Sequence, residues 1–537
     1  MGILYTIMMR KSLSFWHWLL LAIVIVSLLS LLALWSWGTF ARSAYGDNSY
    51  TLATHDNATP LDRLAQSLLH DKEPQTSGVG LLDDGVDAFI ARGRSARLAE
   101  RSLDIQYYIW RHDTTGRLLE REIMQAAERG VRVRLLLDDF SVAGRDDEFL
   151  AMDAHPNVEI RLFNPARNRT GVFRRAVEMA LRFISFNRRM HNKAWIADNR
   201  LAVVGGRNVG DEYFGASDST NYRDTDFLLL GDAVSQSSRI FDRFWNAQEV
   251  IPLRALHAKG SRWSAEEFHA RQLAWFQDNA SQPWLEAMQA RERLIDAMGS
   301  DSLRLHWSSQ IRVISDPPSK ASARASQRNV SDWLLYDISA LLFSAQHDTW
   351  MISPYFVPGE GGTLLLAGQV RRGRRVRVLT NSLAATDVAL VHAGYSRYRS
   401  RLLSTGIKLY ELKPDQESAS SKHKFRGSSG ASLHSKAFVV DNARGFLGSF
   451  NLDPRSMQLN TEMGVLFDDE AIAAELTDFF ERSIQRSAAW RLSLQAEDGS
   501  LRWQGEDAET FTQEPHTAWW QRWLVRGLGW LPIESQL

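Results

Sequence analysis

The chain has 537 residues, of which 44% are hydrophobic and 10% aromatic, a composition typical of a folded protein with roughly two to four domains. Its 63 lysine and arginine residues balance 63 aspartate and glutamate residues, so the net charge favours neither a nucleic-acid-binding protein nor one with an acidic tail. Any attraction to anions must therefore be local. There is no cysteine, which excludes disulfides, thiol catalysis and thiolate metal sites.

An uncharged apolar stretch runs from Leu19 to Trp37, and with Phe15 to Trp18 it reaches the length of about 20 residues that spans a bilayer. Tryptophans stand at both ends, where their rings suit the headgroup level. Residues 1–44 are therefore predicted to form a transmembrane anchor. Arg10 and Lys11 precede the span, which favours a cytoplasmic N-terminus and a body on the other side. A cleaved signal peptide is the alternative, but no clear small-x-small cleavage site follows.

Residues 45–80 are polar and predict a tether. From 81 to 250 the chain alternates apolar patterns of helical and strand period, and the order strand, helix, strand predicts a parallel βαβ unit. The expected elements are a helix over Asp84–Glu100, strands over Leu103–Trp110, Val131–Leu137 and Val158–Phe163, a helix over Gly116–Arg129, and a strand pair over 191–198 and 201–206.

Residues 326–492 repeat this order. The spacing from Gly130 to His191 equals that from Gly373 to His434 (191 − 130 = 434 − 373 = 61), which predicts a duplicated α/β unit whose halves pack as pseudo-twofold mates. Residues 251–325 are expected to be a helical connector, and 493–537 a tryptophan-rich segment on the membrane surface. The elements expected in the second half are helices over Val330–Ala345 and Thr363–Arg372 and strands over Thr349–Tyr355 and Val376–Leu379.

A pattern of His, x, Lys, four further residues and Asp occurs twice, and an Asn follows each His after 17 residues (208 − 191 = 451 − 434 = 17). One copy of His-x-Lys is weak evidence of a site, but two copies on a duplicated scaffold are specific. Because ligand sites commonly lie at the seam between such halves, the two copies predict one composite active site. The residues are His191, Lys193, Asp198 and Asn208 in the first half, and His434, Lys436, Asp441 and Asn451 in the second.

These residue types suit chemistry at a phosphodiester. One neutral His can attack phosphorus while a second, protonated His donates to the departing oxygen. Residues i and i+2 of a strand share a face, so each Lys can bind phosphate oxygens beside its His, and the Asn amides can stabilise the transition state.

A carboxylate is expected to orient each His. Asp224 and Glu462 open corresponding strands downstream of the two motifs and are the candidates. Asp198 and Asp441 end their strands on short turns, and we expect them to bind loop backbone rather than transfer protons.

At these residues the sequence resembles the phospholipase D superfamily, in particular the cardiolipin synthase branch of the bacterial cardiolipin synthase C type. The resemblance runs from about Asp84 to Arg491, and includes 103–110, 189–193, 204–211 and 448–456. It implies a duplicated phospholipase D-like α/β/α sandwich with two pseudo-twofold halves. It also implies a ping-pong reaction without metal or cofactor, with His191 as the nucleophile and His434 as the acid and then the base.

Four further residues are expected to bind substrate: Tyr107, Arg207, Tyr355 and Ser449. The first half has Gly206 where the second has Ser449, so the halves need not contribute equally.

Two further segments favour lipid as the substrate. Gly171 to Arg189 has an apolar helical face with arginines around it, and an ordinary core helix with a solvated basic edge explains it equally well. Residues 519–531 combine tryptophans with arginines, and burial against the domain is the alternative. We expect a phosphatidyltransferase of the bacterial inner membrane with a periplasmic body, which makes cardiolipin from phosphatidylglycerol and a second phospholipid. A phospholipase D-type hydrolase is the nearest alternative, and a phosphodiesterase or nuclease a more distant one. No nucleic-acid partner is expected, and the oligomeric state is not predicted.

Overall fold

The computed structural model describes the chain in ranges separated by gaps. They are residues 15–40, 45–55, 57–167, 169, 178, 182, 186–257, 260–279, 283–298, 304–322, 330–414, 432–531 and 534–536. The predicted amphipathic stretch from Gly171 to Arg189 lies mostly outside the described residues, and Arg10, Lys11 and residues 415–431 lie outside them too.

The first half is built on a nine-stranded sheet in the order β10-β1-β8-β6-β5-β2-β3-β4-β9. β2, β3 and β4 are parallel at its centre, and the strands toward β1 are antiparallel. The strands are β1 (Ser77–Leu82), β2 (Ser102–Tyr107), β3 (Arg132–Asp138), β4 (Val158–Phe163), β5 (Ala194–Ala197), β6 (Leu201–Gly205), β8 (Asp226–Gly231), β9 (Val250–Pro252) and β10 (His306–Ser308).

The second half repeats this sheet in the order β11-β18-β17-β16-β12-β13-β14-β19, and β20 and β21 extend its edge. The register is repeated too: Ile105 lies between Leu135 and Trp195, and Met351 lies between Val378 and Phe438. The duplication is therefore confirmed. The strands are β11 (Ile311–Ser315), β12 (Asp348–Ile352), β13 (Arg375–Asn381), β14 (Lys408–Leu412), β16 (Ala437–Val440), β17 (Arg444–Gly448), β18 (Met463–Asp468), β19 (Ala489–Leu494), β20 (Leu501–Gln504) and β21 (Thr510–Phe511).

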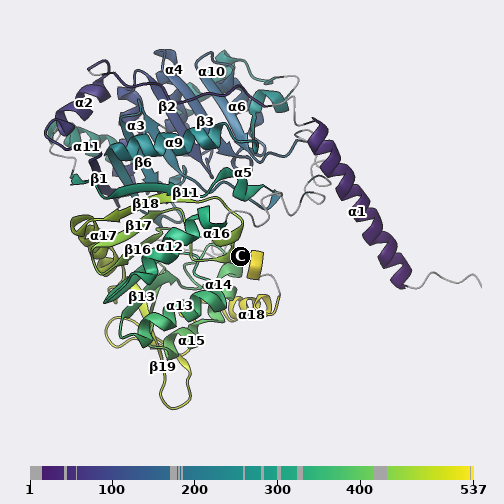
Figure 1. Cartoon of the computed structure of the whole chain (residues 1–537), viewed down its shortest axis with the longest axis vertical. Coiled ribbons are helices and arrows are strands. Elements are labelled where there is room, and N and C mark those ends of the chain that lie inside the picture. Colours follow the sequence, from purple (N-terminus) through teal and green to yellow (C-terminus); the bar gives the residue numbers. More distant parts are fainter. Residues whose placement is uncertain are drawn as a thin grey trace, which may run out of the picture.

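Helices cover both faces of each sheet and agree closely with the predicted ones (Figure 1). The first half contains α2 (Pro60–Leu69), α3 (Gly85–Leu98), α4 (Thr114–Glu128), α5 (Asp139–Val142), α6 (Asp146–Asp153), η2 (Asp211–Tyr213), α9 (Asp232–Trp245) and η3 (Leu253–Leu256). The connector contributes α10 (Ala265–Asn279) and α11 (Pro283–Met298), and the second half η5 (Pro318–Ala321), η6 (Val330–Asp332), α12 (Leu334–Phe343), α13 (Gly359–Arg371), α14 (Ala389–Ser396), α15 (Arg399–Ser404), α16 (Pro454–Gln458), α17 (Glu470–Ser483), α18 (Trp519–Leu528) and η8 (Glu534–Gln536).

The two halves share one hydrophobic core. It contains apolar residues of α9 and α17 together with the inner faces of both sheets. Phe227 of β8 and Phe467 of β18 meet there edge to face, with ring centroids 6.1 Å apart. Because β6, β8, β17 and β18 lie against one another, the residues that follow β6 and β17 and those that precede β8 and β18 are brought to the same seam. Each half also has an outer core of its own.

The stretch 45–80, predicted to be a tether, is folded against the first half. It contains α2 and most of β1, and the backbone carbonyl of Ser49 accepts a hydrogen bond from the buried Arg134 (2.8 Å). Thr59 caps α2 and Asp62 closes the capping box. The polar residues of this stretch, which suggested a linker, cap a helix and bind buried arginines. Sequence composition alone does not distinguish such residues from polar residues that face solvent.

The N-terminal helix α1 (Phe15–Phe40) extends away from the two halves (Figure 1). Within the part of the chain that the structure describes, we find no helix whose length and apolar character would carry it across a membrane. At the other end, 493–537 is not a separate segment, since β20 and β21 pair with the second sheet.

Asp198 and Asp441 both bind backbone at the start of a central strand. The carboxylate of Asp198 accepts hydrogen bonds from the N–H groups of Glu100, Arg101 and Ser102 (2.7–3.1 Å). Asp441 does the same for residues 346–348, in a more exposed position. We expect Asp198→Ala to lower the free energy of unfolding by about 2–4 kcal/mol, because it leaves three backbone N–H groups, one of them buried and two partly buried, without an acceptor.

Thermal denaturation of the purified protein measures this effect. Asp441→Ala is the matched control, and it should cost less, since water can reach the freed N–H groups there. Equal losses in the two variants would contradict the argument from burial.

Candidate active site

The two motif histidines precede corresponding hairpins, β5–β6 and β16–β17, at the seam between the halves. The backbone before each His pairs with the segment that carries the carboxylate of the other half. His191 N–H donates to the carbonyl of Thr461 (2.9 Å), next to Glu462, and His434 N–H donates to that of Arg223 (2.9 Å), next to Asp224. A short parallel ladder, β7 (Tyr222–Arg223) with β15 (Ser432–Leu433), continues the second contact.

The side chains also pair across the seam, each His with a carboxylate of the other half. His191 Nδ1 lies 2.8 Å from Glu462 Oε2, and His434 Nδ1 lies 2.5 Å from Asp224 Oδ2. All four side chains are buried, with at most 7% of any residue exposed. A carboxylate that accepts the Nδ1 proton fixes the imidazole tautomer and leaves Nε2 free for chemistry. Each half therefore supplies one His and the carboxylate for the other half's His.

The lysines and asparagines surround this pair. Lys193 Nζ donates to the carbonyl of its own motif His, His191, at 2.7 Å, and Lys436 Nζ lies 3.1 Å from His434 Nδ1. Asn208 accepts from the N–H of Ile109 (3.2 Å) and donates to the hydroxyl of Tyr213 (2.9 Å). Oδ1 of Asn451 is buried and has no hydrogen-bond partner among the described residues. Buried cations and an amide oxygen without a partner are typical of a site that binds a polar ligand.

Burial and the two lysines set the protonation states. Burial, then Lys193 and Lys436, lower the pKa of His191 well below its ordinary value. Burial and Lys436 lower the pKa of His434 to about 4, although Asp224 acts in the opposite direction. Burial also lowers the pKa of Lys193 to about 7 and that of Lys436 to about 8. Both imidazoles are thus neutral at pH 7, and an anionic ligand would raise every one of these pKa values.

The two carboxylates differ. Burial raises the pKa of Asp224, but His434 and Lys436 outweigh it and bring that pKa down to about 2. Burial raises the pKa of Glu462 to about 7, with Lys193 as the main opposing group. Near neutral pH, His434 therefore has a fully ionised partner, whereas His191 has a partner that is ionised only in part.

Tyrosines that the sequence analysis missed wall the site. The ring of Tyr108 lies 5.0 Å from that of His191, and the rings of Tyr213 and Tyr222 lie 5.1 and 5.3 Å from that of His434. A usable signal was available for Tyr108, because it leaves β2 one residue after Tyr107 and so points the other way. Nothing in the sequence connected Tyr213 or Tyr222 with His434.

Three of the four expected substrate-binding residues are placed differently. Tyr107 is buried in the core of the first half, where its hydroxyl accepts from Arg92 (2.8 Å). Arg207 is 1% exposed and donates to Asp226 and to the carbonyl of Leu82, so it holds the first half together. These two expectations were wrong, because each side chain is buried and forms its hydrogen bonds within the protein.

Ser449 is fully buried and donates to Glu462 Oε2 at 2.5 Å, so it orients the carboxylate and does not face a substrate. At the corresponding position of the first half, a Cβ on Gly206 would lie 2.3 Å from Asp224 Oδ1. The longer Glu leaves room for a Ser, and the shorter Asp requires a Gly. Tyr355 is half-buried, and its hydroxyl donates to Asp387 (2.8 Å) near Tyr213 and Tyr222.

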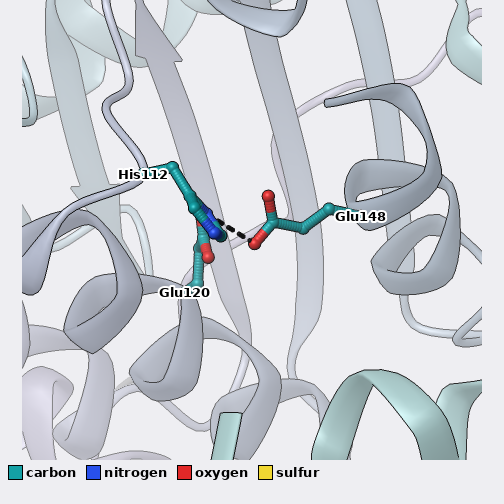
Figure 2. Close-up of side chains that lie close together, drawn as sticks. All are labelled: His112, Glu120 and Glu148. Carbon is teal, nitrogen blue, oxygen red and sulfur yellow. Dashed lines mark ion pairs between the residues drawn. The ribbon is translucent and has the colours of Figure 1, made fainter. Parts of the chain in front are cut away.

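One other group of described side chains combines metal-ligand types, namely His112, Glu120 and Glu148 (Figure 2). His112 Nδ1 lies 2.9 Å from Glu148, and the guanidinium of Arg145 lies 2.7 Å from Glu120 and 2.8 Å from Glu148. Arg145 thus already supplies the positive charge that a cation would bring. We interpret this cluster as an ion-pair network that joins α4, α6 and the segment between β2 and α4.

Comparison with known proteins agrees with this geometry. A family model described as "Cardiolipin synthase, PLD-like domain" matches residues 94–245 and 338–484, which together make up more than half of the chain. The chain belongs to this family. Its resemblance to the phospholipase D superfamily, cardiolipin synthase branch, is therefore confirmed.

Cardiolipin synthase C of Escherichia coli (strain K12) is 40% identical over 483 residues, which are 88% of this chain and 99% of that protein. Cardiolipin synthase of Geobacillus kaustophilus (strain HTA426) is 28% identical over 79% of this chain and 69% of its own length. Phosphatidylserine synthase of Haemophilus influenzae Rd KW20 superimposes with a TM-score of 0.52 at 14% identity, over 79% of this chain and 90% of that one, which shows a common fold.

The electrostatics of the site can be tested without any substrate. In the free protein the imidazole of His434 should titrate near pH 4, and Lys436→Met should raise its pKa by about one unit, because a neighbouring cation disfavours imidazolium. NMR of histidine rings, with His434 assigned from its missing signal in His434→Gln, measures this pKa. Lys408→Met, at an exposed strand position, is the control and should leave it unchanged. A pKa of His434 that is the same in both Lys variants would contradict the assigned cause.

Proposed function

We propose that the protein is a membrane-associated phosphatidyltransferase that forms cardiolipin through a phosphatidyl-histidine intermediate. One observation carries the proposal: two buried histidines face one seam, each with Nδ1 held by a carboxylate from the opposite half. This arrangement suits a nucleophile and a proton donor on opposite sides of one phosphorus. Similarity to cardiolipin synthases over most of the chain supports phosphatidyl transfer as the reaction.

In the first step His191 Nε2 attacks the phosphorus of a donor phospholipid. The bond from phosphorus to the headgroup oxygen breaks, and His434, protonated at Nε2, gives its proton to that oxygen, so the headgroup leaves as an alcohol. His434 is neutral in the free site, and the bound phosphodiester anion supplies the charge that raises its pKa for this task.

In the second step a free hydroxyl of phosphatidylglycerol is the acceptor. His434 takes its proton as the oxygen attacks phosphorus, the P–N bond to His191 breaks, and His191 is restored. The product joins two phosphatidyl groups through one glycerol, which is cardiolipin. Lys193, Lys436, Asn208 and Asn451 stabilise the charge on the phosphoryl oxygens in both steps. We further propose that Tyr355, beside Asp387, contacts the lipid headgroup.

We also propose that the N-terminal segment anchors the protein in the bacterial inner membrane with the body on the periplasmic side. The described side chains of α1 include large aliphatic groups exposed on all sides, Leu19, Leu20, Ile23, Val26 and Leu28 among them. Water is a poor environment for such a surface. The uncharged sequence from Leu19 to Trp37 and the preceding Arg10 and Lys11 support this orientation.

Removal of either imidazole tests the proposal. His191→Ala and His434→Ala should each lower cardiolipin formation at least roughly 1,000-fold, because each lacks the nucleophile or the acid and base. Mass spectrometry of the lipids of expressing cells gives the readout, with His347→Ala, at an exposed position, as the control. With a donor whose headgroup is a good leaving group and needs no acid, His434→Ala quenched in alkali, where a phospho-histidine is stable, should carry the phosphatidyl group on His191.

The same samples distinguish the alternatives. Phosphatidic acid in place of cardiolipin would identify a hydrolase, and DNA cleavage without lipid turnover would identify a nuclease. Normal cardiolipin in either histidine variant would refute the proposal.

The fit of Gly206 against Asp224 gives a second test. Gly206→Ala should lower cardiolipin formation roughly 100-fold, because the new methyl group displaces Asp224 and with it the ring of His434. Ser449→Ala removes hydrogen bonds to Glu462 and to the backbone of Met463 but introduces no steric clash, and it should cost less. Gly361→Ala, with no atom within 4 Å of the new Cβ, should have no effect. Wild-type activity of Gly206→Ala at wild-type thermal stability would show that the position of Asp224 is not critical.

A further inference from the structure

The surface of the C-terminal segment is unusually rich in exposed aromatic side chains. On α18 Trp519 is 69% exposed and Trp523 66%, and beyond the helix Trp530 is 89% exposed. Trp519 and Trp523 are four residues apart and therefore lie on one side of the helix. An isolated exposed tryptophan needs no explanation, but a row of them does.

The opposite side of α18 is firmly packed. Val525 is buried against Leu383 and Ala393, and Leu528 packs beside them. The helix thus has an inner face that fixes it to α14 and the loop before it, and an outer face of tryptophans. Burial against the domain, the alternative for this segment, accounts for the inner face alone.

This segment borders the active site from the side of the second half. The loop under α18 carries Asp387, which binds Tyr355 and lies near the tyrosines beside His434. At the chain end, Arg455 donates to the carbonyl of Gln536 (3.4 Å) and to Asn187 (2.9 Å), and its charge acts on His191. The C-terminal segment therefore contacts residues that border the site, the loop with Asp387 on the side of His434 and Arg455 on the side of His191.

The first half also has an exposed aromatic side chain close to the site. The ring of Tyr108, which contacts His191, is stacked on that of Phe140, with centroids 6.1 Å apart. Phe140 is 61% exposed. In Figure 1, α5, α18, the C-terminus and α1 lie on the same side of the molecule. Both halves thus present exposed aromatic side chains next to the site.

We propose that Phe140, Trp519, Trp523 and Trp530 form a collar that inserts into the headgroup layer of the membrane and presents the mouth of the active site to the bilayer. The proposal rests on the function proposed above and adds where the lipid enters. Tryptophan rings prefer this layer, and the exposed Arg526 on the same helix adds attraction to anionic headgroups. A lipid would then reach the histidines without leaving the membrane fully.

Photo-crosslinking in membranes tests the position of the collar independently of catalysis. The full chain, with p-benzoylphenylalanine at position 523, is irradiated in vesicles of phosphatidylglycerol and phosphatidylethanolamine. We expect a lipid adduct at 523 and none at 336 on α12, where the exposed Tyr336 gives a matched control site. A crosslink from 523 to a second copy of the chain, or equal lipid adducts at both positions, would overturn the proposal.

A paired activity measurement separates the collar from the chemistry. Trp519→Ser combined with Trp523→Ser should lower transfer between long-chain lipids in vesicles roughly tenfold, while transfer between short-chain lipids dissolved as monomers stays within about twofold of wild type. Tyr336→Ser should change neither rate. Equal losses on both substrates would refute the collar, whereas absence of transfer in the wild-type protein would refute the proposed function instead.

Discussion

The structure depends on an exchange of side chains across the seam between its two halves. His191 is held by Glu462 and His434 by Asp224, so neither half contains a complete catalytic pair. The backbone supports the exchange, because the segment before each His is hydrogen-bonded to the segment that carries the other half's carboxylate. The common core around α9 and α17 and the packing of Phe227 on Phe467 keep this geometry fixed. Folding and assembly of the site are therefore one event.

The pseudo-twofold symmetry is not exact where the chemistry happens. In each half a carboxylate must fit against the residue two positions before the motif Asn. Asp224 fits against Gly206 and Glu462 against Ser449, and the two carboxyl groups differ in pKa. The ionised Asp224 stabilises an imidazolium on His434, while burial raises the pKa of Glu462 to about 7 beside a neutral His191. This difference suits the proposed roles of His434 as proton carrier and His191 as nucleophile. In a perfectly symmetric site the two histidines would have the same environment.

Two buried lysines lie beside the two neutral imidazoles of the site. Desolvation is costly for each ammonium group, and it lowers the pKa values of Lys193 and Lys436 to about 7 and 8. Glu462 and Asp224 offset part of this cost. A phosphodiester adds negative charge, so its binding and the protonation of the site are linked.

The sequence by itself determined the duplication, the order of strands and helices, and the motif residues, since hydrophobic period and exact spacing are local properties of the chain. It also predicted that Asp224 and Glu462 orient the histidines, and that Asp198 and Asp441 bind backbone N–H groups. Only the tertiary structure decided which carboxylate meets which His, that Tyr107 and Arg207 are consumed by the interior, and that Tyr108, Tyr213 and Tyr222 wall the site. The contacts at the site join residues about 80 to 270 positions apart, and the burial of Tyr107 and Arg207 depends on how the elements of the first half pack. No local pattern of the sequence encodes either.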